Sequence, residues 1–123
     1  MSKILGVILI DHGSRQEESN QAFFKIVERL ARRGQYPIVE PAHMELSSPT
    51  LAEAFDRAVA RGATELIVHP YFLLPGKHWH VDIPRLCEDA SKKHPGVRWK
   101  VTPPLGESDL ILDLVVERIE ALR

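Results

Sequence analysis

Short apolar runs alternate with segments of helical periodicity along the whole chain of 123 residues, and this alternation restricts the fold more than any other feature. Residues 3–10, KILGVILI, are apolar almost throughout, which is typical of a strand buried on both faces of a parallel sheet. Strands that alternate with helices form parallel sheets through right-handed crossovers. We therefore predict an α/β fold, with a four-stranded parallel sheet flanked by helices in a single domain, residues 1–123. Strands are expected at 3–10, 37–44, 65–74 and 97–101, and helices at 16–33, 48–62, 83–94 and 108–122.

Prolines indicate how two of these elements are built. Pro41 lies inside the second expected strand, and because proline cannot donate a hydrogen bond to a neighbouring strand, we expect an edge or bulged strand there. Two start points fit the second helix. In one, Ser48 caps the helix and Pro49 occupies its first turn. In the other, Thr50 caps the helix in a capping box with Glu53.

Three polar residues follow successive expected strands at equal intervals. Glu45 lies 33 residues after His12, and His78 lies 33 residues after Glu45; one strand–helix unit takes roughly 30 residues. Because the carboxyl ends of parallel strands share one edge of the sheet, where such sheets bind ligands, this spacing predicts that the three side chains meet in one crevice. Two imidazoles and one carboxylate form a suitable ligand set for a divalent transition metal.

Composition excludes several classes of protein. A net charge of -1 and a pI near 6.6 argue against a nucleic-acid partner, which requires a strong basic excess. The apolar residues 4–10 are too few to span a membrane, so no membrane partner is expected. A single cysteine, Cys87, cannot form an internal disulfide, which favours a cytoplasmic location.

The segment DHGSR follows the first expected strand. Gly13 would let the backbone turn tightly while His12 points out from the strand end. Ser14 and Arg15 would then lie near the positive N-terminus of the first helix, where an anionic group is favoured. A capped turn with a structural histidine fits the same residues, so this segment alone decides nothing.

The remaining histidines have plainer interpretations. His43 is expected to be structural or to support the site from behind, and His69, inside an apolar strand, to be a core histidine with its hydrogen bonds satisfied. His80 follows in the segment PGKHWHVD, residues 75–82, which we expect to be an exposed loop. Whether His43 or His80 assists the chemistry stays open. His94 ends a helix, where a cation is favoured, and Cys87 is expected only to pack.

Three motifs in this order resemble the small CbiX/SirB sirohydrochlorin chelatases, over nearly the whole chain. The third motif is distinctive, whereas the first alone is not. In this sequence they are His12-Gly13-Ser14-Arg15, then Glu45-Leu46 with Pro49-Thr50, and Phe72-Leu73-Leu74 with Gly76, His78 and Asp82-Ile83-Pro84.

The resemblance implies a class II chelatase fold and an enzyme that inserts Co²⁺, Fe²⁺ or Ni²⁺ into sirohydrochlorin, on the route to cobalamin or sirohaem. It makes His12, Glu45 and His78 the metal ligands and catalytic residues, with the metal as a substrate and no permanently bound cofactor. It also implies a homodimer that completes the cleft. One departure is Asp11, where the family usually has glycine; this aspartate would place a negative charge near the site.

Chelation exchanges two pyrrole N–H protons for one metal ion. We expect His12 and His78 to bind the metal, and one of them or Glu45 to accept the protons. Because the substrate carries many carboxylates, we expect Ser14, Arg15 and Lys77 to bind it, with Arg15 able to grip a carboxylate in bidentate fashion. Arg85 is a more distant candidate.

Two other functions fit parts of the pattern. Histidine phosphatases also carry His-Gly after a first strand, but they need an arginine directly before the histidine and several more around the phosphate, whereas here Asp11 precedes His12 and only Arg15 is near. A non-catalytic metal carrier or sensor would use the same ligands. Binding of the tetrapyrrole would distinguish it from a chelatase.

Overall fold

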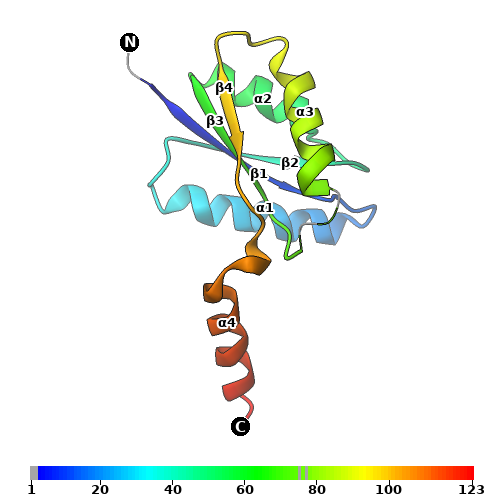
Figure 1. Cartoon of the computed structure of the whole chain (residues 1–123), viewed down its shortest axis with the longest axis vertical. Coiled ribbons are helices and arrows are strands. Elements are labelled where there is room, and N and C mark those ends of the chain that lie inside the picture. Colours follow the sequence, from blue (N-terminus) through cyan, green and yellow to red (C-terminus); the bar gives the residue numbers. More distant parts are fainter. Residues whose placement is uncertain (1–2, 75, 77) are drawn as a thin grey trace.

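The computed structural model describes residues 3–74, 76 and 78–123 and contains one parallel sheet in the order β2-β1-β3-β4 (Figure 1). The prediction of four parallel strands is confirmed, and β2 lies at an edge, as Pro41 indicated. The strands are β1 at Leu5–Asp11, β2 at Ile38–His43, β3 at Glu65–Pro70 and β4 at Arg98–Val101.

Alternating side chains of β1 point into two separate cores. Val7 and Leu9 pack with α1 (Glu17–Arg32) on one face of the sheet. Ile8 and Ile10 pack on the other face with α2 (Leu51–Ala60) and α3 (Ile83–Ser91). In Figure 1 the sheet lies between α1 and the pair α2 and α3. Neighbouring residues at the end of β1 therefore point to different faces of the sheet.

The second helix begins at the later of its two predicted start points. Thr50 caps α2: its side chain accepts a hydrogen bond from the backbone N–H of Glu53 at 3.2 Å, and the Glu53 carboxylate accepts one from the backbone N–H of Thr50 at 3.2 Å. The Ser48 hydroxyl instead donates to the Glu53 carboxylate at 3.0 Å. The capping box is therefore the device that starts α2.

The region after β3 differs from the sequence prediction. The strand ends at Pro70 rather than at residue 74, and the backbone N–H of Phe72 donates to the carbonyl of Pro70 at 2.9 Å, which turns the chain out of the sheet. The predicted loop is partly helical, because residues His78–Asp82 form a π-helical turn that runs directly into α3. The second half of the third motif therefore leads directly into the start of α3.

The last helix, α4 (Asp109–Glu120), covers neither face of the sheet, unlike α1, α2 and α3. It follows a short 3-10 turn at Leu105–Glu107, contains no buried residue, and extends away from the rest of the molecule (Figure 1). None of the helices in the described part of the chain is long and apolar enough to cross a membrane.

Candidate metal and substrate site

Two of the three predicted ligand residues lie side by side at the carboxyl edge of the sheet. Beyond the last paired residues of β1 and β2, the backbone N–H of Met44 donates to the carbonyl of Asp11 at 2.9 Å, and that of Glu45 donates to the carbonyl of His12 at 3.3 Å. The pairing of the two strands therefore continues into their loops. The sequence prediction that His12 and Glu45 are neighbours in space agrees with this geometry.

Gly13 allows this close approach. Its φ is +85°, and a Cβ at this position would lie 2.1 Å from the carbonyl oxygen of Glu45. No side chain fits at that distance, and L-residues rarely adopt that φ. The glycine of the first motif therefore holds the His12 loop against the Glu45 loop.

The His12 ring rests on an aromatic side chain from the end of β3. His12 is exposed and stacks on Phe72, with ring centroids 4.2 Å apart and an angle of 17° between the planes. Phe72 itself is buried and belongs to the core on the α2 and α3 side. One face of the imidazole is therefore covered by the phenyl ring. Phe72 was part of a recognised motif, but its contact with His12 was not predicted.

Glu45 is exposed beside a surface hollow on the α3 side of the sheet. Asp82 and Arg85, from the start of α3, line the same hollow. Arg85 is therefore nearer to the candidate site than the sequence indicated, and a cation faces the region in which a polycarboxylate substrate is expected. The hollow is completed by Met44 and Leu86.

The third predicted ligand cannot be placed at the level of its side chain. The backbone of His78 begins the π-helical turn that leads into α3, on the same side of the sheet as the hollow. Its side chain and the whole of Lys77 lie outside the described residues. Among the residues that are described, no group of three His, Cys, Asp or Glu side chains is arranged to hold a metal ion. The three-ligand site thus stays a prediction.

The two other predicted substrate residues lie at the start of α1. The backbone N–H of Ser14 donates to the Asn20 side chain at 3.1 Å, and the Asn20 amide donates back to the Ser14 carbonyl at 2.9 Å. The Ser14 hydroxyl accepts from the backbone N–H of Gln16 at 3.0 Å. Asn20 is buried, so it anchors this turn from inside the helix and leaves Arg15 exposed next to it. Asn20 was missed in the sequence because it lacks any motif.

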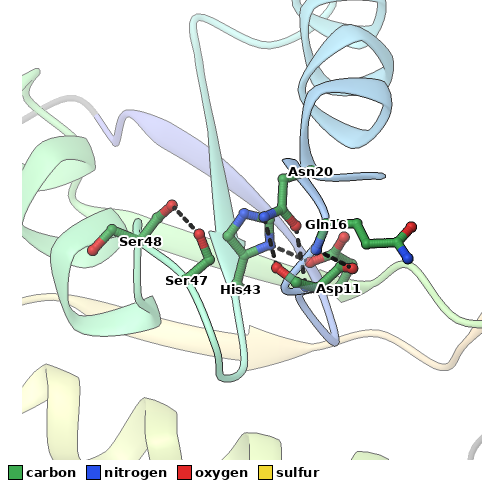
Figure 2. Close-up of polar contacts among 7 residues, drawn as sticks. Asp11, Gln16, Asn20, His43, Ser47 and Ser48 are labelled. Atoms are coloured by element: carbon green, nitrogen blue, oxygen red, sulfur yellow. Dashed lines mark hydrogen bonds and ion pairs between the residues drawn. The ribbon is translucent and has the colours of Figure 1, made fainter. Parts of the chain in front are cut away.

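Asp11 has a partner on the opposite face of the sheet from His12. Its carboxylate lies 2.5 Å from Nδ1 of His43 (Figure 2). His43 is fully buried, and its ring contacts the rings of Phe23 and Phe24 of α1. The expected structural role of His43 agrees with this burial. Among the described residues, Nε2 of His43 is the one buried side-chain nitrogen or oxygen without a hydrogen-bond partner. The carboxylate of Asp11 therefore points to an interior histidine on the α1 side of the sheet and not into the candidate site.

The other candidate residues have the plainer roles expected of them. Nδ1 of His69 lies 2.6 Å from the Thr102 hydroxyl, and burial lowers the pKa of this histidine. Burial also raises the pKa of the Cys87 thiol to about 12, as expected for a cysteine that only packs. His94 follows α3, which ends at Ser91 and not at residue 94 as the sequence predicted, and pairs with Asp56 at 2.7 Å.

Comparison with known proteins assigns this arrangement to a family. Residues 6–122 match the sequence profile of the family CbiX. The chain is 48% identical to a chloroplastic sirohydrochlorin ferrochelatase of Arabidopsis thaliana over 115 residues, 94% of this chain and 51% of that protein. It is 32% identical to a sirohydrochlorin cobaltochelatase of Methanocaldococcus jannaschii, covering 91% of this chain and 95% of that protein.

Solved structures agree with these sequence matches. The cobalt complex of the sirohydrochlorin chelatase SirB from Bacillus subtilis subspecies spizizenii superimposes with a TM-score of 0.89 at 27% identity, over 96% of this chain and 50% of that chain. A CbiX protein from Marinobacter aquaeolei gives a TM-score of 0.77 at 30% identity, over 95% of this chain and 98% of that chain. The chain thus spans about half the length of some relatives and nearly the full length of others. Since the profile match covers almost every residue, the chain belongs to the CbiX family.

Proposed function

We propose that this protein is a sirohydrochlorin chelatase, a lyase-class enzyme that inserts Co²⁺ or Fe²⁺ into sirohydrochlorin in cobalamin or sirohaem biosynthesis, with Ni²⁺ as a third candidate metal. The observation that carries the proposal is the contact between the His12 and Glu45 loops at the open edge of the sheet, in a chain whose named relatives are sirohydrochlorin ferrochelatases and cobaltochelatases. The metal is a substrate, and no permanently bound cofactor is required.

The reaction needs a site that holds a metal ion loosely and accepts two protons. As the metal binds to the four nitrogens of the macrocycle, two pyrrole N–H bonds break and their protons leave. Neutral imidazoles of His12 and His78 suit borderline cations such as Co²⁺ and Fe²⁺. The exposed carboxylate of Glu45 can take a proton and exchange it with solvent. An open site with few protein ligands also favours release of the metal to the substrate.

Cationic and polar groups around this edge suit a substrate with many carboxylates. Arg15 is exposed at the start of α1, and Arg85 lines the hollow beside Glu45. Both guanidinium groups can bind a carboxylate in bidentate fashion. Ser14 and Lys77 complete the proposed set of substrate-binding residues. Substitution of Arg15 by alanine is therefore expected to raise KM more than it lowers kcat.

The test is insertion of Co²⁺ into sirohydrochlorin, followed by absorbance, with the purified protein and its variants His12→Ala, Glu45→Ala and His78→Ala. We expect each variant to lose activity by about 10²-fold or more, as for loss of a group that acts in proton transfer. The matched control is His94→Ala, which removes a histidine in the turn after α3 that pairs with Asp56. Rates like those of the unmodified protein in all three site variants would refute the assignment. Binding of Co²⁺ without binding of sirohydrochlorin would instead identify a metal carrier.

The remaining proposals concern the state of the protein. We propose that residues 1–123 act as one domain, that two copies form a homodimer, and that the protein is cytoplasmic. Dimerisation is supported by the exposed apolar helix α4, which no other part of the described chain buries. The plant relative is named as chloroplastic, so location is tested separately, by fractionation of cells that express the protein.

A further inference from the structure

Helix α4 exposes a large apolar surface to water, and this exposure is unfavourable in free energy. Most of its apolar side chains are exposed, Leu110 by 76% and Ile119 by 57%, and the helix has no buried residue. Large exposed apolar patches mark interaction sites. The exposed apolar residues of this segment are Leu110, Leu112, Leu114, Val115, Val116, Ile119 and Leu122.

The acidic residues of α4 form one stripe, and Arg118 is the single basic residue of the helix. Asp109, Asp113, Glu117 and Glu120 follow one another at intervals of four, four and three residues, which places all four carboxylates on one side of a helix. Apolar residues occupy most of the remaining circumference. A helix that is apolar over most of its circumference is normally buried, so α4 is expected to have a partner that covers much of its surface.

The start of α4 is fixed in a direction that leads away from its own sheet. The backbone N–H of Leu105 donates to the carbonyl of Phe72 at 2.9 Å. A Cβ at Gly106 would lie 1.9 Å from the carbonyl oxygen of Leu73, so this turn is in direct backbone contact with the segment after β3. The Ser108 side chain then caps the helix by accepting from the backbone N–H of Leu110 at 3.2 Å. Folding back onto the same chain would break these contacts.

The same molecule has an apolar groove with nothing in it on the α1 side of the sheet. Its floor is formed by Val7, Leu9 and Ile67, and its wall by Leu30 and Tyr36. A smaller hollow between α1 and Tyr71 continues it. A helix that follows the last strand of such a sheet would normally lie in this position, next to α1.

Unpaired cations border the groove on both sides. Arg29 and Arg33 of α1 line the smaller hollow. On β4, Trp99 and Val101 pack into the core of the opposite face, so Arg98 and Lys100 project on the groove side, and Lys100 is paired in register with Ile67 of the floor. Within the described part of the chain, no ion pair joins any of these four cations to a carboxylate. The acidic stripe of α4 has the complementary charge.

We infer that α4 of each copy lies in the groove of a second copy, between α1 and β4, in a reciprocal exchange about a two-fold axis. The inference rests on the proposed homodimer and specifies its interface. A two-fold interface presents the same patch from both copies, and here each copy supplies one helix and one groove. Because α4 leaves the sheet at its carboxyl edge, this arrangement also brings the second copy to the edge that carries His12 and Glu45.

The first experiment mixes two differently tagged full-length variants, one carrying Glu117→Cys and the other carrying Arg33→Cys or Lys100→Cys, and treats them with a short bismaleimide. We expect a cross-link between the two tags. The matched control replaces Glu117→Cys with Glu88→Cys, at an exposed position of α3 on the other face of the sheet, and should give none. The native Cys87 is buried with a pKa raised to about 12, so it does not compete. A Glu88→Cys cross-link as strong as that of Glu117→Cys would overturn the inference.

The second experiment measures dimerisation by sedimentation equilibrium. The double variant Asp113→Lys/Glu117→Lys is expected to weaken the dimer by about tenfold or more through like-charge contacts. Mixing it with Arg33→Glu/Lys100→Glu should restore association between the two variants. An unmodified protein that is monomeric, or a dimer unaffected by both double variants, would refute the helix exchange. A monomer that still inserts cobalt refutes the homodimer and this inference but not the chelatase activity, whereas a cross-linked dimer without activity refutes the chelatase activity and not the helix exchange.

Discussion

At the carboxyl edge of the sheet, polar residues that are close in sequence differ in exposure between the two faces. On the α1 face, Asp11 and His43 pair with each other, and the histidine is fully buried. On the other face, His12 and Glu45 are exposed, although each is within two residues of one member of that pair. The difference shows that strand alternation, and not residue type, decides which of these groups is available to a ligand.

The two pairs also have different energetic roles. Removal of an interior polar group leaves its partner without hydrogen bonds in a site that water does not reach, so the fold loses stability. Removal of an exposed group is compensated by water, and its main cost falls on whatever that group binds. We therefore expect substitutions in the first pair to change the free energy of unfolding and substitutions in the second pair to change activity.

The largest expected effect on stability comes from His43→Ala. This change removes a ring that is in contact with Phe23 and Phe24 and leaves Asp11 without its partner, so we expect a loss of about 3–5 kcal/mol in the free energy of unfolding. Urea denaturation measures it. The matched control is His12→Ala, a histidine at the neighbouring strand end, which should change stability by about 0.5 kcal/mol or less. Equal losses of stability in the two variants would contradict the proposed difference between the two pairs.

Gly13→Ala tests the contact that holds the two loops together. The added Cβ would collide with the carbonyl oxygen of Glu45 at 2.1 Å and would require a φ of +85°, so we expect a loss of about 2–3 kcal/mol together with lower activity. Gly34→Ala is the control, because its φ is +73° but nothing lies within 4 Å of the new Cβ. It should lose only about 1 kcal/mol and keep its activity. Equal effects in the two variants would show that the loop contact is unimportant.

Asp11→Asn should reduce the free energy of unfolding less than His43→Ala or Gly13→Ala does. The amide keeps the size of the carboxylate but weakens the short contact with His43, which lies in a site of low exposure. We expect a loss of about 1–2 kcal/mol in the free energy of unfolding, because a hydrogen bond to a charged group is replaced by a neutral one. The rate of cobalt insertion measured in parallel should change less than it does in Glu45→Asn. A rate loss as large as that of Glu45→Asn would place Asp11 in the site itself.

The sequence predicted the sheet well because its signals are local. Buried parallel strands are apolar throughout, as residues 5–10 are, and the capping box of Thr50 and Glu53 needs only four consecutive positions. The contact between His12 and Glu45 was also predictable, since it follows from the period of one strand–helix unit.

The missed features all depend on contacts between distant segments. The stacking of His12 on Phe72 joins the ends of two strands, and the pair of Asp11 and His43 spans 32 residues. The sequence could not place α4, because an apolar helix fits a sheet face equally well whether the sheet belongs to its own chain or to another.

The smallest expected effect concerns His69, whose exposure lies between that of buried His43 and that of exposed His12. It is half-buried on the α1 face, in register with Leu9, and contacts the Thr102 hydroxyl at 2.6 Å. Burial lowers its pKa below the ordinary value of 6.5, since desolvation disfavours the charged ring. The unfolded chain therefore binds a proton first as the pH falls, and the stability contributed by neutral His69 is present above pH 6.5 and is lost below it. Histidine resonances followed by NMR should show a midpoint below 6.5 for His69, and His69→Asn should reduce the loss of stability between pH 7 and pH 5. A midpoint above 6.5 would show that the α1 face at this position is open to water.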